Sequence, residues 1–190
     1  MKEKLRQALA SRQKVRLSCS GLTEAAVIVP IFSKGGEYHL LFTLRSEQVA
    51  HHKGQISFPG GTRSEGDHSL LDTALREGSE EIGLKAEDAE VLGELDDTPT
   101  ATSNFNVSPF VVFIPHPYEF KLNRYEIDEI FSISVSVLLR KADKGEECYT
   151  FDNEVFIGYT YEYEGKVIWG ATARIVHQFL EVWQSAIEIK

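Results

Sequence analysis

Cysteine is scarce in this sequence: only Cys19 and Cys148 occur among 190 residues. Neither lies in a Cys-x-x-Cys pair, so the sequence offers neither the thiolates of a structural zinc site nor a disulfide framework. We therefore interpret both residues as isolated thiols, buried or incidental.

Long apolar runs are also missing. The longest, residues 25–32, is far shorter than the ~20 residues that a membrane-spanning helix needs. The N-terminal stretch MKEKLRQALASRQK is charged throughout and lacks the apolar core of a signal peptide. We therefore expect a cytoplasmic protein without a membrane segment.

Positive charge is in deficit, since 20 Lys and Arg residues stand against 29 Asp and Glu residues and the formal net charge is −9. Nucleic acids and anionic membranes bind surfaces whose Lys and Arg neutralise phosphates. The charge therefore argues against both as partners. A small phosphorylated ligand remains compatible if metal ions shield it.

The chain does have enough apolar material for a core, because 42% of its residues are hydrophobic and aromatic residues make up 11% of the chain. It has no repeats, low-complexity tracts or domain linkers. We expect one domain over residues 1–190, in which residues 1–22 form an N-terminal helix and a link.

Hydrophobic periodicity indicates an α/β (α+β) fold. Apolar residues at helical spacing predict helices at 3–12, 69–82 and 171–183. β-Branched and aromatic runs predict strands at 25–32, 38–45, 89–95, 107–114, 129–133, 159–163 and 166–169. Residues 46–66 and 98–104 are expected to be loops. Many strands with few long helices indicate a mixed β-sheet sandwiched between α-helices, with additional hairpins.

The helix predicted at 69–82 carries signals at both ends. Ser69 and Asp72 resemble a capping box at its start, and Gly83 followed by Leu84 suits a C-terminal stop. Inside it, Gly78 costs roughly 1 kcal/mol relative to Ala, which indicates close packing at that position.

The last turn of this helix holds a cluster of like charges. Glu77, Glu80 and Glu81 are spaced i, i+3 and i+4, so their carboxylates share one face and repel one another. They also lie where the helix dipole disfavours anions by ~0.3–1 kcal/mol each. A bound cation would compensate this conflict, and clustered carboxylates are hard ligands suited to Mg²⁺ or Mn²⁺. A solvated acidic face is the alternative interpretation.

A glycine pair upstream favours a ligand site. Gly60 and Gly61 allow a loop backbone to approach a ligand closely, and Pro59 stiffens the entry to this loop. A Pro-Gly-Gly turn alone is weak evidence, but the turn and the acidic cluster together favour a ligand site over a solvated face.

Gly61 and the segment REGSEEIGL, residues 76–84, resemble the box of the Nudix hydrolases: a glycine, a spacer and REUxEExGU, where U is a bulky aliphatic residue. The spacer is one residue longer than the general family pattern, and Gly78 replaces an aliphatic residue. Asp67 matches the usual upstream acid. The resemblance implies the Nudix fold and hydrolysis of a pyrophosphate linkage in a nucleoside-diphosphate compound.

Residues 40–61 (LLFTLRSEQVAHHKGQISFPGG) are similar to the signature of the coenzyme A pyrophosphatase branch, which shares the longer spacer. The branch has an Arg where this chain has Ala50, which removes a potential phosphate contact unless His51, His52 or Lys53 replaces it. The resemblance implies coenzyme A or its thioesters as substrate, cleaved to phosphopantetheine and adenosine 3′,5′-bisphosphate. The matching positions are Arg45, Ser46, Gly54, Phe58, Pro59, Gly60 and Gly61.

The resemblance also implies residue roles. Mg²⁺, with Mn²⁺ as a substitute, would be held by Glu77, Glu80, Glu81 and the carbonyl of Gly60, and a metal-bound water would attack phosphorus. Arg76 would complete the catalytic set by orienting Glu77 or offsetting the acidic charge, or it would be a structural partner of Glu80. The general base would be one of the glutamates or a later acid. Candidates for the later acid are Glu126 and Glu129, and the implied substrate-binding residues are Arg45, Ser46, Gly54, Phe58 and Gly61.

Alternatives to the coenzyme A interpretation stay open. The small-molecule nucleotide substrate could instead be ADP-ribose or a dinucleotide, since Ala50 departs from the branch signature. A non-catalytic nucleotide-binding module is another alternative, although the box retains its Arg and all three glutamates. A homodimer that uses the apolar strands and the aromatic-rich residues 156–169 is also an open prediction.

Overall fold

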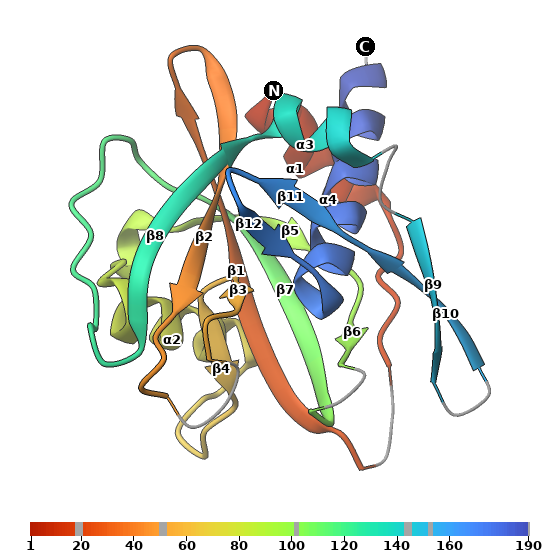
Figure 1. Cartoon of the computed structure of the whole chain (residues 1–190). Helices are drawn as coiled ribbons and strands as arrows, with labels where there is room; N and C mark the ends of the chain where they lie inside the picture. Colours follow the sequence, from red (N-terminus) through yellow and green to blue (C-terminus); the bar gives the residue numbers. More distant parts are fainter. Residues whose placement is uncertain (18–20, 50–52, 101–102, 143–145, 152–153, 190) are drawn as a thin grey trace.

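The computed structural model describes residues 1–17, 21–49, 53–100, 103–142, 146–151 and 154–189 (Figure 1). In chain order, its elements are α1 (Lys2–Ser11), β1 (Thr23–Lys34), β2 (Glu37–Arg45), β3 (Ile56–Ser57), β4 (Gly60–Thr62), α2 (Leu70–Ile82), η1 (Ala86–Asp88), β5 (Glu90–Glu94), β6 (Thr98–Pro99), β7 (Phe105–Phe113), β8 (Ile127–Ser134), α3 (Val135–Ala142), β9 (Glu146–Phe151), β10 (Glu154–Tyr159), β11 (Tyr161–Tyr163), β12 (Lys166–Ile168) and α4 (Gly170–Glu188).

A mixed sheet forms the centre of the molecule. Its main order is β3-β2-β1-β7-β5, while β8 pairs with β2, β4 with β1 and β6 with β7. β1 runs antiparallel to β2 and parallel to β7, from the Thr23–Phe105 pair to the Ile31–Phe113 pair. Parallel and antiparallel pairs in one sheet confirm the predicted mixed architecture.

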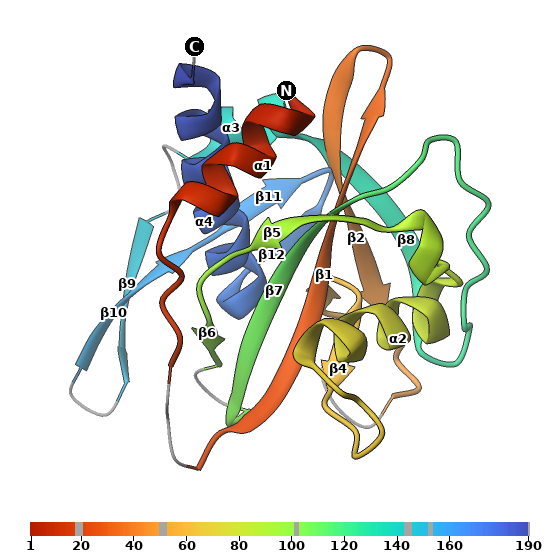
Figure 2. The same ribbon diagram turned by 180° about the vertical axis from the view of Figure 1, so that it is seen from behind.

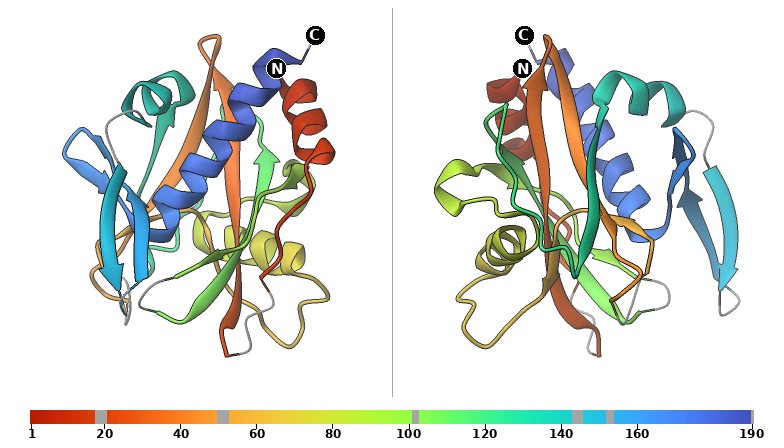
Figure 3. Two further views of the ribbon diagram at one scale, coloured as in Figure 1. Left: turned by 90° about the vertical axis from the view of Figure 1, so that its right-hand side faces the viewer. Right: turned by 60° about the vertical axis from the view of Figure 1, so that its left-hand side comes forward.

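Helices cover both faces of this sheet (Figures 2 and 3). On one face, Ala74 and Ile82 of α2 belong to the same buried cluster as Ile28 of β1. On the other face, Phe179 of α4 shares a cluster with Ile31 of β1. Because neighbouring residues of a strand point to opposite faces, β1 supplies side chains to both clusters.

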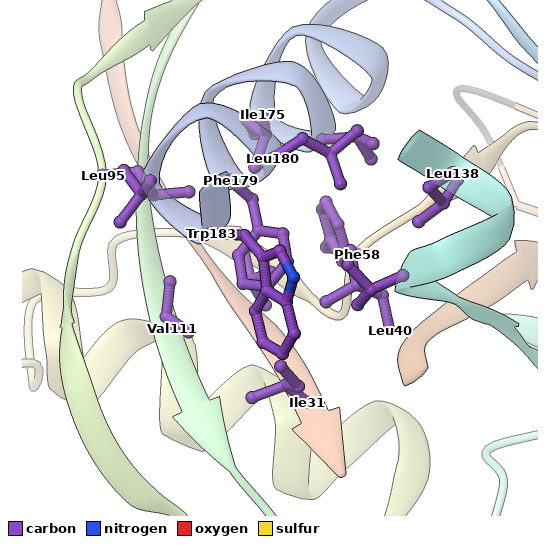
Figure 4. Packing of buried hydrophobic residues seen from close by; sticks show 14 of the residues in the cluster. Ile31, Leu40, Phe58, Leu95, Val111, Leu138, Ile175, Phe179, Leu180 and Trp183 are labelled. Carbon is purple, nitrogen blue, oxygen red and sulfur yellow. The ribbon is translucent and has the colours of Figure 1, made fainter. Parts of the chain in front are cut away.

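The larger apolar cluster lies between the sheet and α4 (Figure 4). Phe179 and Trp183 project from α4 toward Ile31, Leu40 and Val111 of the strands, and all five side chains are buried. Burial contributes roughly 25 cal/mol per Å² of apolar surface, so this cluster stabilises the packing of α4 on the sheet.

The long elements confirm the sequence-based prediction. α1, α2 and α4 occur where helices are predicted, although α4 continues to Glu188. The hairpins β1–β2 and β11–β12 are also confirmed. Within the described ranges, no helix has both the length and the apolar character needed to cross a lipid bilayer.

Other elements correct the prediction. β3 and β4 lie within residues 46–66, and β6 lies within residues 98–104, although the sequence predicts loops in both segments. α3 and the β9–β10 hairpin are not predicted at all. β3, β4 and β6 have two or three residues each, too few for a period-2 pattern to be recognised.

Candidate active site

α2 positions the three glutamates of the cluster, and its ends are fixed by its own sequence. At its start, the Ser69 hydroxyl oxygen accepts a hydrogen bond from the backbone N of Asp72 at 3.1 Å. At its end, Gly83 adopts a left-handed φ of 68°, and its N–H donates to the carbonyl of Ser79. The predicted start and glycine stop of the helix are therefore confirmed.

Glycines bring the backbone of β4 and α2 close to neighbouring groups. A Cβ atom at Gly60 would lie 2.3 Å from a backbone oxygen of β1, and a Cβ at Gly61 would lie 2.5 Å from Cδ of Glu77. A Cβ at Gly78 would lie 2.8 Å from Cδ1 of Ile28. Glycine thus lets β4 and α2 approach β1 closely and brings the Glu77 carboxylate against β4.

Glu81 is the most enclosed carboxylate of the cluster, with 1% of its surface exposed. Its Oε1 accepts a hydrogen bond from Nη1 of Arg45, and its Oε2 accepts one from the backbone N of Gly60, both at 3.1 Å. The pKa of Glu81 is raised to about 7, mainly by burial and to a smaller extent by the charges of Glu77 and Glu126, whereas Arg45 and the Gly60 N–H lower it. Near neutral pH, this group therefore exchanges a proton readily.

Arg76 joins the other two glutamates to the rest of the site. Its Nη1 donates to Oε1 of Glu77 at 2.8 Å and to Oε2 of Glu80 at 3.2 Å. Its Nε and Nη2 donate to the two carboxylate oxygens of Asp67 at 3.0 and 3.1 Å, and Nη2 also donates to the Thr62 carbonyl at 3.1 Å. The two contacts that the sequence offered as alternatives occur together, since Arg76 contacts both Glu77 and Glu80.

Asp67 anchors this guanidinium. Its Oδ2 also accepts hydrogen bonds from the backbone N of Ser64 at 2.8 Å and from Oγ1 of Thr73 at 2.9 Å. The hydrogen bonds from Arg76, followed by the one from Ser64, hold the pKa of Asp67 well below its ordinary value. The upstream acid of the motif is therefore an ionised anchor for Arg76 in this structure.

The structure separates the two late acids. Asn123 links Glu126 to the cluster, because its backbone N donates to the carbonyl of Glu81 at 2.9 Å and its side chain donates to Oε1 of Glu126 at 3.1 Å. The charge of Glu126 contributes to the raised pKa of Glu77 and of Glu81. Glu129 instead pairs with Lys166 of β12 at 3.2 Å, and Lys166 lies over the ring of Phe131. Phe131 and Leu44, the pairing partner of Glu129 in β2, pack in the cluster on the α4 side. Glu129 therefore lies on the sheet face away from the glutamates, which corrects its candidacy.

Two of the predicted substrate-binding residues shape the turn after β2. Gly54 has a left-handed φ of 62°, and its N–H donates to the carbonyl of Arg45 at 3.1 Å. Ser46 is buried, and its Oγ accepts a hydrogen bond from the backbone N of Gln48 at 3.1 Å. These contacts fix the backbone that directly follows the Arg45 side chain.

Phe58 departs from its predicted role. It is only 2% exposed and stacks on Phe42 in the core, with ring centroids 4.9 Å apart. A side chain this enclosed presents no surface to a ligand, so its prediction as a substrate contact is corrected to core packing. The positions Ala50, His51 and His52 lie outside the described residues.

The chemistry of the donor set fits a divalent cation. Among the described residues, no three Asp, Glu, His or Cys side chains converge as a formed metal site. Arg45 is bonded to Glu81, and Arg76 to Glu77. Burial nevertheless raises the pKa of Glu77 as well as that of Glu81, in spite of these arginines. Their negative charge is thus incompletely balanced, a condition that a hard cation relieves.

Sequence reasoning missed one polar residue of this region, Asn123. Its backbone N–H donates to the carbonyl of Glu81 at 2.9 Å, and its side chain donates to Oε1 of Glu126 at 3.1 Å. No motif marks Asn123, and its signal in the sequence is limited to the polar run ahead of β8. Its place beside Glu81 and Glu126 is therefore visible only in the structure.

Clustered glutamates in the last turn of a helix, set beside a Gly-Gly strand on a mixed sheet between helices, define a class of hydrolases that cleave diphosphate linkages. The chain belongs to the Nudix family, since the model of the NUDIX domain matches residues 22–152. It is accordingly a Nudix pyrophosphohydrolase, and enzymes of this family act on small-molecule nucleotide substrates.

Relatives support this family membership. The chain is 35% identical over 164 residues to the uncharacterized Nudix hydrolase NudL of Yersinia enterocolitica. The match covers 83% of this chain and 80% of the relative. It is 33% identical over 140 residues to the peroxisomal coenzyme A diphosphatase NUDT7 of Mus musculus. This match covers 73% of this chain and 58% of the mouse protein.

A solved structure supports the fold. The MutT/nudix family protein from Enterococcus faecalis superposes with a TM-score of 0.57 at 14% sequence identity, over 90% of this chain and 66% of that chain. At this identity the likeness concerns the fold alone.

Proposed function

We propose that this chain hydrolyses the diphosphate linkage of coenzyme A or its thioesters and depends on Mg²⁺, for which Mn²⁺ substitutes. The contact of Arg45 and Gly60 with the two carboxylate oxygens of Glu81 carries this proposal. Through it, the signature segment at 40–61 and the Nudix box at 76–84 form one site. The mouse relative, named as a coenzyme A diphosphatase, adds support.

The reaction consumes one water molecule. An oxygen of water forms a bond to one phosphorus of the diphosphate, the bond from that phosphorus to the bridging oxygen breaks, and the bridging oxygen leaves with the other phosphate. The products are phosphopantetheine, or its acylated form, and adenosine 3′,5′-bisphosphate. A divalent cation held by Glu77, Glu80, Glu81 and the Gly60 carbonyl would neutralise the diphosphate and lower the pKa of water.

The protein's own side chains would then have separate tasks. Arg76, anchored by Asp67, would hold Glu77 and Glu80 in place. One of the glutamates of the cluster, or Glu126, would accept the proton that water loses. Arg45, when released from Glu81 by a cation, would be free to bind a phosphate oxygen.

The test is a substrate panel with Mg²⁺: coenzyme A, acetyl-coenzyme A, ADP-ribose, NADH and diadenosine tetraphosphate, with products identified by chromatography. We expect adenosine 3′,5′-bisphosphate from the first two, and its loss in Glu81→Gln. Glu181→Gln is the matched control, because Glu181 is an exposed glutamate of α4, paired with His177. It should retain full turnover.

Other outcomes would redirect the proposal. Preferential cleavage of ADP-ribose or a dinucleotide would retain the Nudix chemistry and overturn the coenzyme A assignment, which is the alternative that Ala50 favours. Turnover of none of these compounds with Mg²⁺ or Mn²⁺ would support a nucleotide-binding module.

Homodimer formation is a separate part of the proposal. Val167 and Trp169, within the aromatic-rich segment, are 47% and 51% exposed in the single chain. Apolar side chains of this size at the surface are suited to an interface. Light scattering after size exclusion should give twice the mass of the chain, and a monomer at all concentrations would contradict this expectation.

A further inference from the structure

The segment ahead of β8 folds against the end of α2. The backbone N of Lys121 donates to the carbonyl of Ile82 at 3.0 Å, and the backbone N of Asn123 donates to the carbonyl of Glu81 at 2.9 Å. These are carbonyls that the last turn of a helix leaves without intrahelical partners. Figures 1 and 2 show the connection from β7 to β8 passing beside α2. The segment is thus tied to the residue that provides the buried carboxylate of the cluster.

Asn123 organises the turn that follows. Its side-chain Oδ1 accepts a hydrogen bond from the backbone N of Tyr125 at 3.2 Å, and its Nδ2 donates to Oε1 of Glu126 at 3.1 Å. Its carbonyl accepts hydrogen bonds from the backbone N of Glu126 at 3.0 Å and of Ile127 at 2.8 Å. One side chain therefore closes the turn and also fixes the direction of the Glu126 carboxylate.

Glu126 is held from a second side as well. Its carbonyl accepts a hydrogen bond from the backbone N of Ser46 at 2.8 Å, which connects it to the turn after β2. The same turn begins with Arg45, the partner of Glu81. The backbone of Glu126 is therefore fixed relative to both parts of the site, and the direction of its carboxylate depends on Asn123.

We propose that Asn123 is a positioning residue of this hydrolase: by donating to Glu126, it keeps a fourth carboxylate beside Glu77 and Glu81 and so raises the affinity of the cluster for a divalent cation. This inference rests on the proposed metal-dependent hydrolysis but not on the identity of the substrate. An amide is required at position 123, because an aspartate would keep the acceptor for Tyr125 but repel Glu126.

A double-mutant cycle tests the inference on the substrate-free protein. Mn²⁺ affinity is measured by electron paramagnetic resonance at pH 7.5 for the wild type, Asn123→Ala, Glu126→Gln and the double variant. Partners that orient a metal-binding group typically contribute about tenfold to affinity. We expect each single variant to bind Mn²⁺ about tenfold more weakly, and the double variant to bind no more weakly than Glu126→Gln alone.

A purely structural role would give a different result. If the losses of Asn123→Ala and Glu126→Gln multiply in the double variant, Asn123 does not act through Glu126 and the proposal is wrong. Unchanged Mn²⁺ affinity in both Asn123→Ala and Asn123→Asp would also overturn it. Asn123→Asp covers the case in which the alanine variant fails to fold, since it keeps the acceptor for Tyr125 and should lose affinity nonetheless.

Controls separate this proposal from the proposed function. Asn106→Ala removes an amide that donates to the Leu17 carbonyl at 3.3 Å, at the opposite end of β7 from the connection to β8, and should leave Mn²⁺ affinity unchanged. Absence of Mn²⁺ binding by the wild type would contradict the metal-dependent function itself. With whichever compound the wild type cleaves, Asn123→Asp should lower kcat more than it changes KM.

Discussion

Nη1 of Arg45 lies 3.1 Å from Oε1 of Glu81, and this contact joins the end of β2 to the last turn of α2 across 36 residues of sequence. The guanidinium is largely shielded, with 21% of its side chain exposed, whereas the carboxylate side chain is 1% exposed. A buried carboxylate with one cationic partner is sensitive to the loss of that partner, and substitutions at Arg45 and at Glu81 test this sensitivity.

Removal of the Arg45 charge should destabilise the metal-free protein. In Arg45→Gln the buried Glu81 would be left without its cation, and we expect a loss of about 2–4 kcal/mol in the free energy of unfolding at pH 8 with EDTA. The loss should shrink at pH 5.5, where Glu81 is protonated, and on addition of Mg²⁺. Urea titrations at both pH values check this. An equal loss under all conditions would show that packing, and not charge, dominates.

Glu81→Gln should exchange activity for stability. The pKa of Glu81 is raised from 4.5 to about 7, so between these values the folded state holds a proton that the unfolded state has lost. The stability contributed by this group is therefore present below pH 4.5 and lost as pH rises to about 7. At pH 8 with EDTA, we expect Glu81→Gln to be more stable than the wild type by about 1–3 kcal/mol, with no gain at pH 4.5.

Turnover by Glu81→Gln should fall on the order of 100-fold or more, because the substitution removes a carboxylate charge from the reaction centre. Thermal unfolding and steady-state kinetics on one preparation check both effects. A variant that is less stable at pH 8 would contradict the account of Glu81 as an undercompensated charge.

Asp67→Asn should loosen Arg76. The ionised Asp67 has a pKa held below its ordinary value of 3.8 by Arg76 and the backbone N–H of Ser64. Its contribution to stability is therefore present above about pH 4 and lost as pH falls through the lowered pKa. We expect kcat to fall about tenfold, and the stability difference from the wild type to narrow as the pH is lowered below 3.8. A constant difference would exclude the ion pair as its cause.

Gly61→Ala should displace the carboxylate of Glu77. The added Cβ would lie 2.5 Å from Cδ of Glu77, closer than a real contact allows, so this side chain must move. We expect at least a tenfold loss of kcat, an effect of the size seen when a metal-binding group is disturbed. Gly66→Ala is the matched control, because a Cβ at Gly66 would have no heavy atom within 4 Å. Similar activities in the two variants would contradict the prediction.

The sequence predicts the parts of this molecule that have local signals. The boundaries of α2 follow from Ser69 and Gly83, which act on backbone groups a few residues away. The long strands follow from runs of apolar residues. α3 is missed because its sequence, VSVLLRKA, continues the alternating pattern of β8. Its capping residue Ser134, whose Oγ accepts a hydrogen bond from the backbone N of Val137 at 3.4 Å, is also the last residue of that strand.

The candidate site is predicted in part for the same reason. The spacing of Glu77, Glu80 and Glu81 is a local property of a helix and is visible in the sequence. Glu126 lies in the turn ahead of β8, whereas Glu129 lies on the sheet face away from the glutamates, and the β2–β8 pairing shifts register at Leu44 and Arg45. That irregularity cannot be inferred from either strand alone.

The parallel pairing of β1 with β7 bears on how the site comes into being during synthesis. Thr23 pairs with Phe105, so the partner strand leaves the ribosome well after α2 and its glutamates. Contacts between distant segments form slowly because a long chain segment must first be closed into a loop. The residues of α2 with its acidic turn are therefore synthesised before β7 and before the turn that carries Glu126.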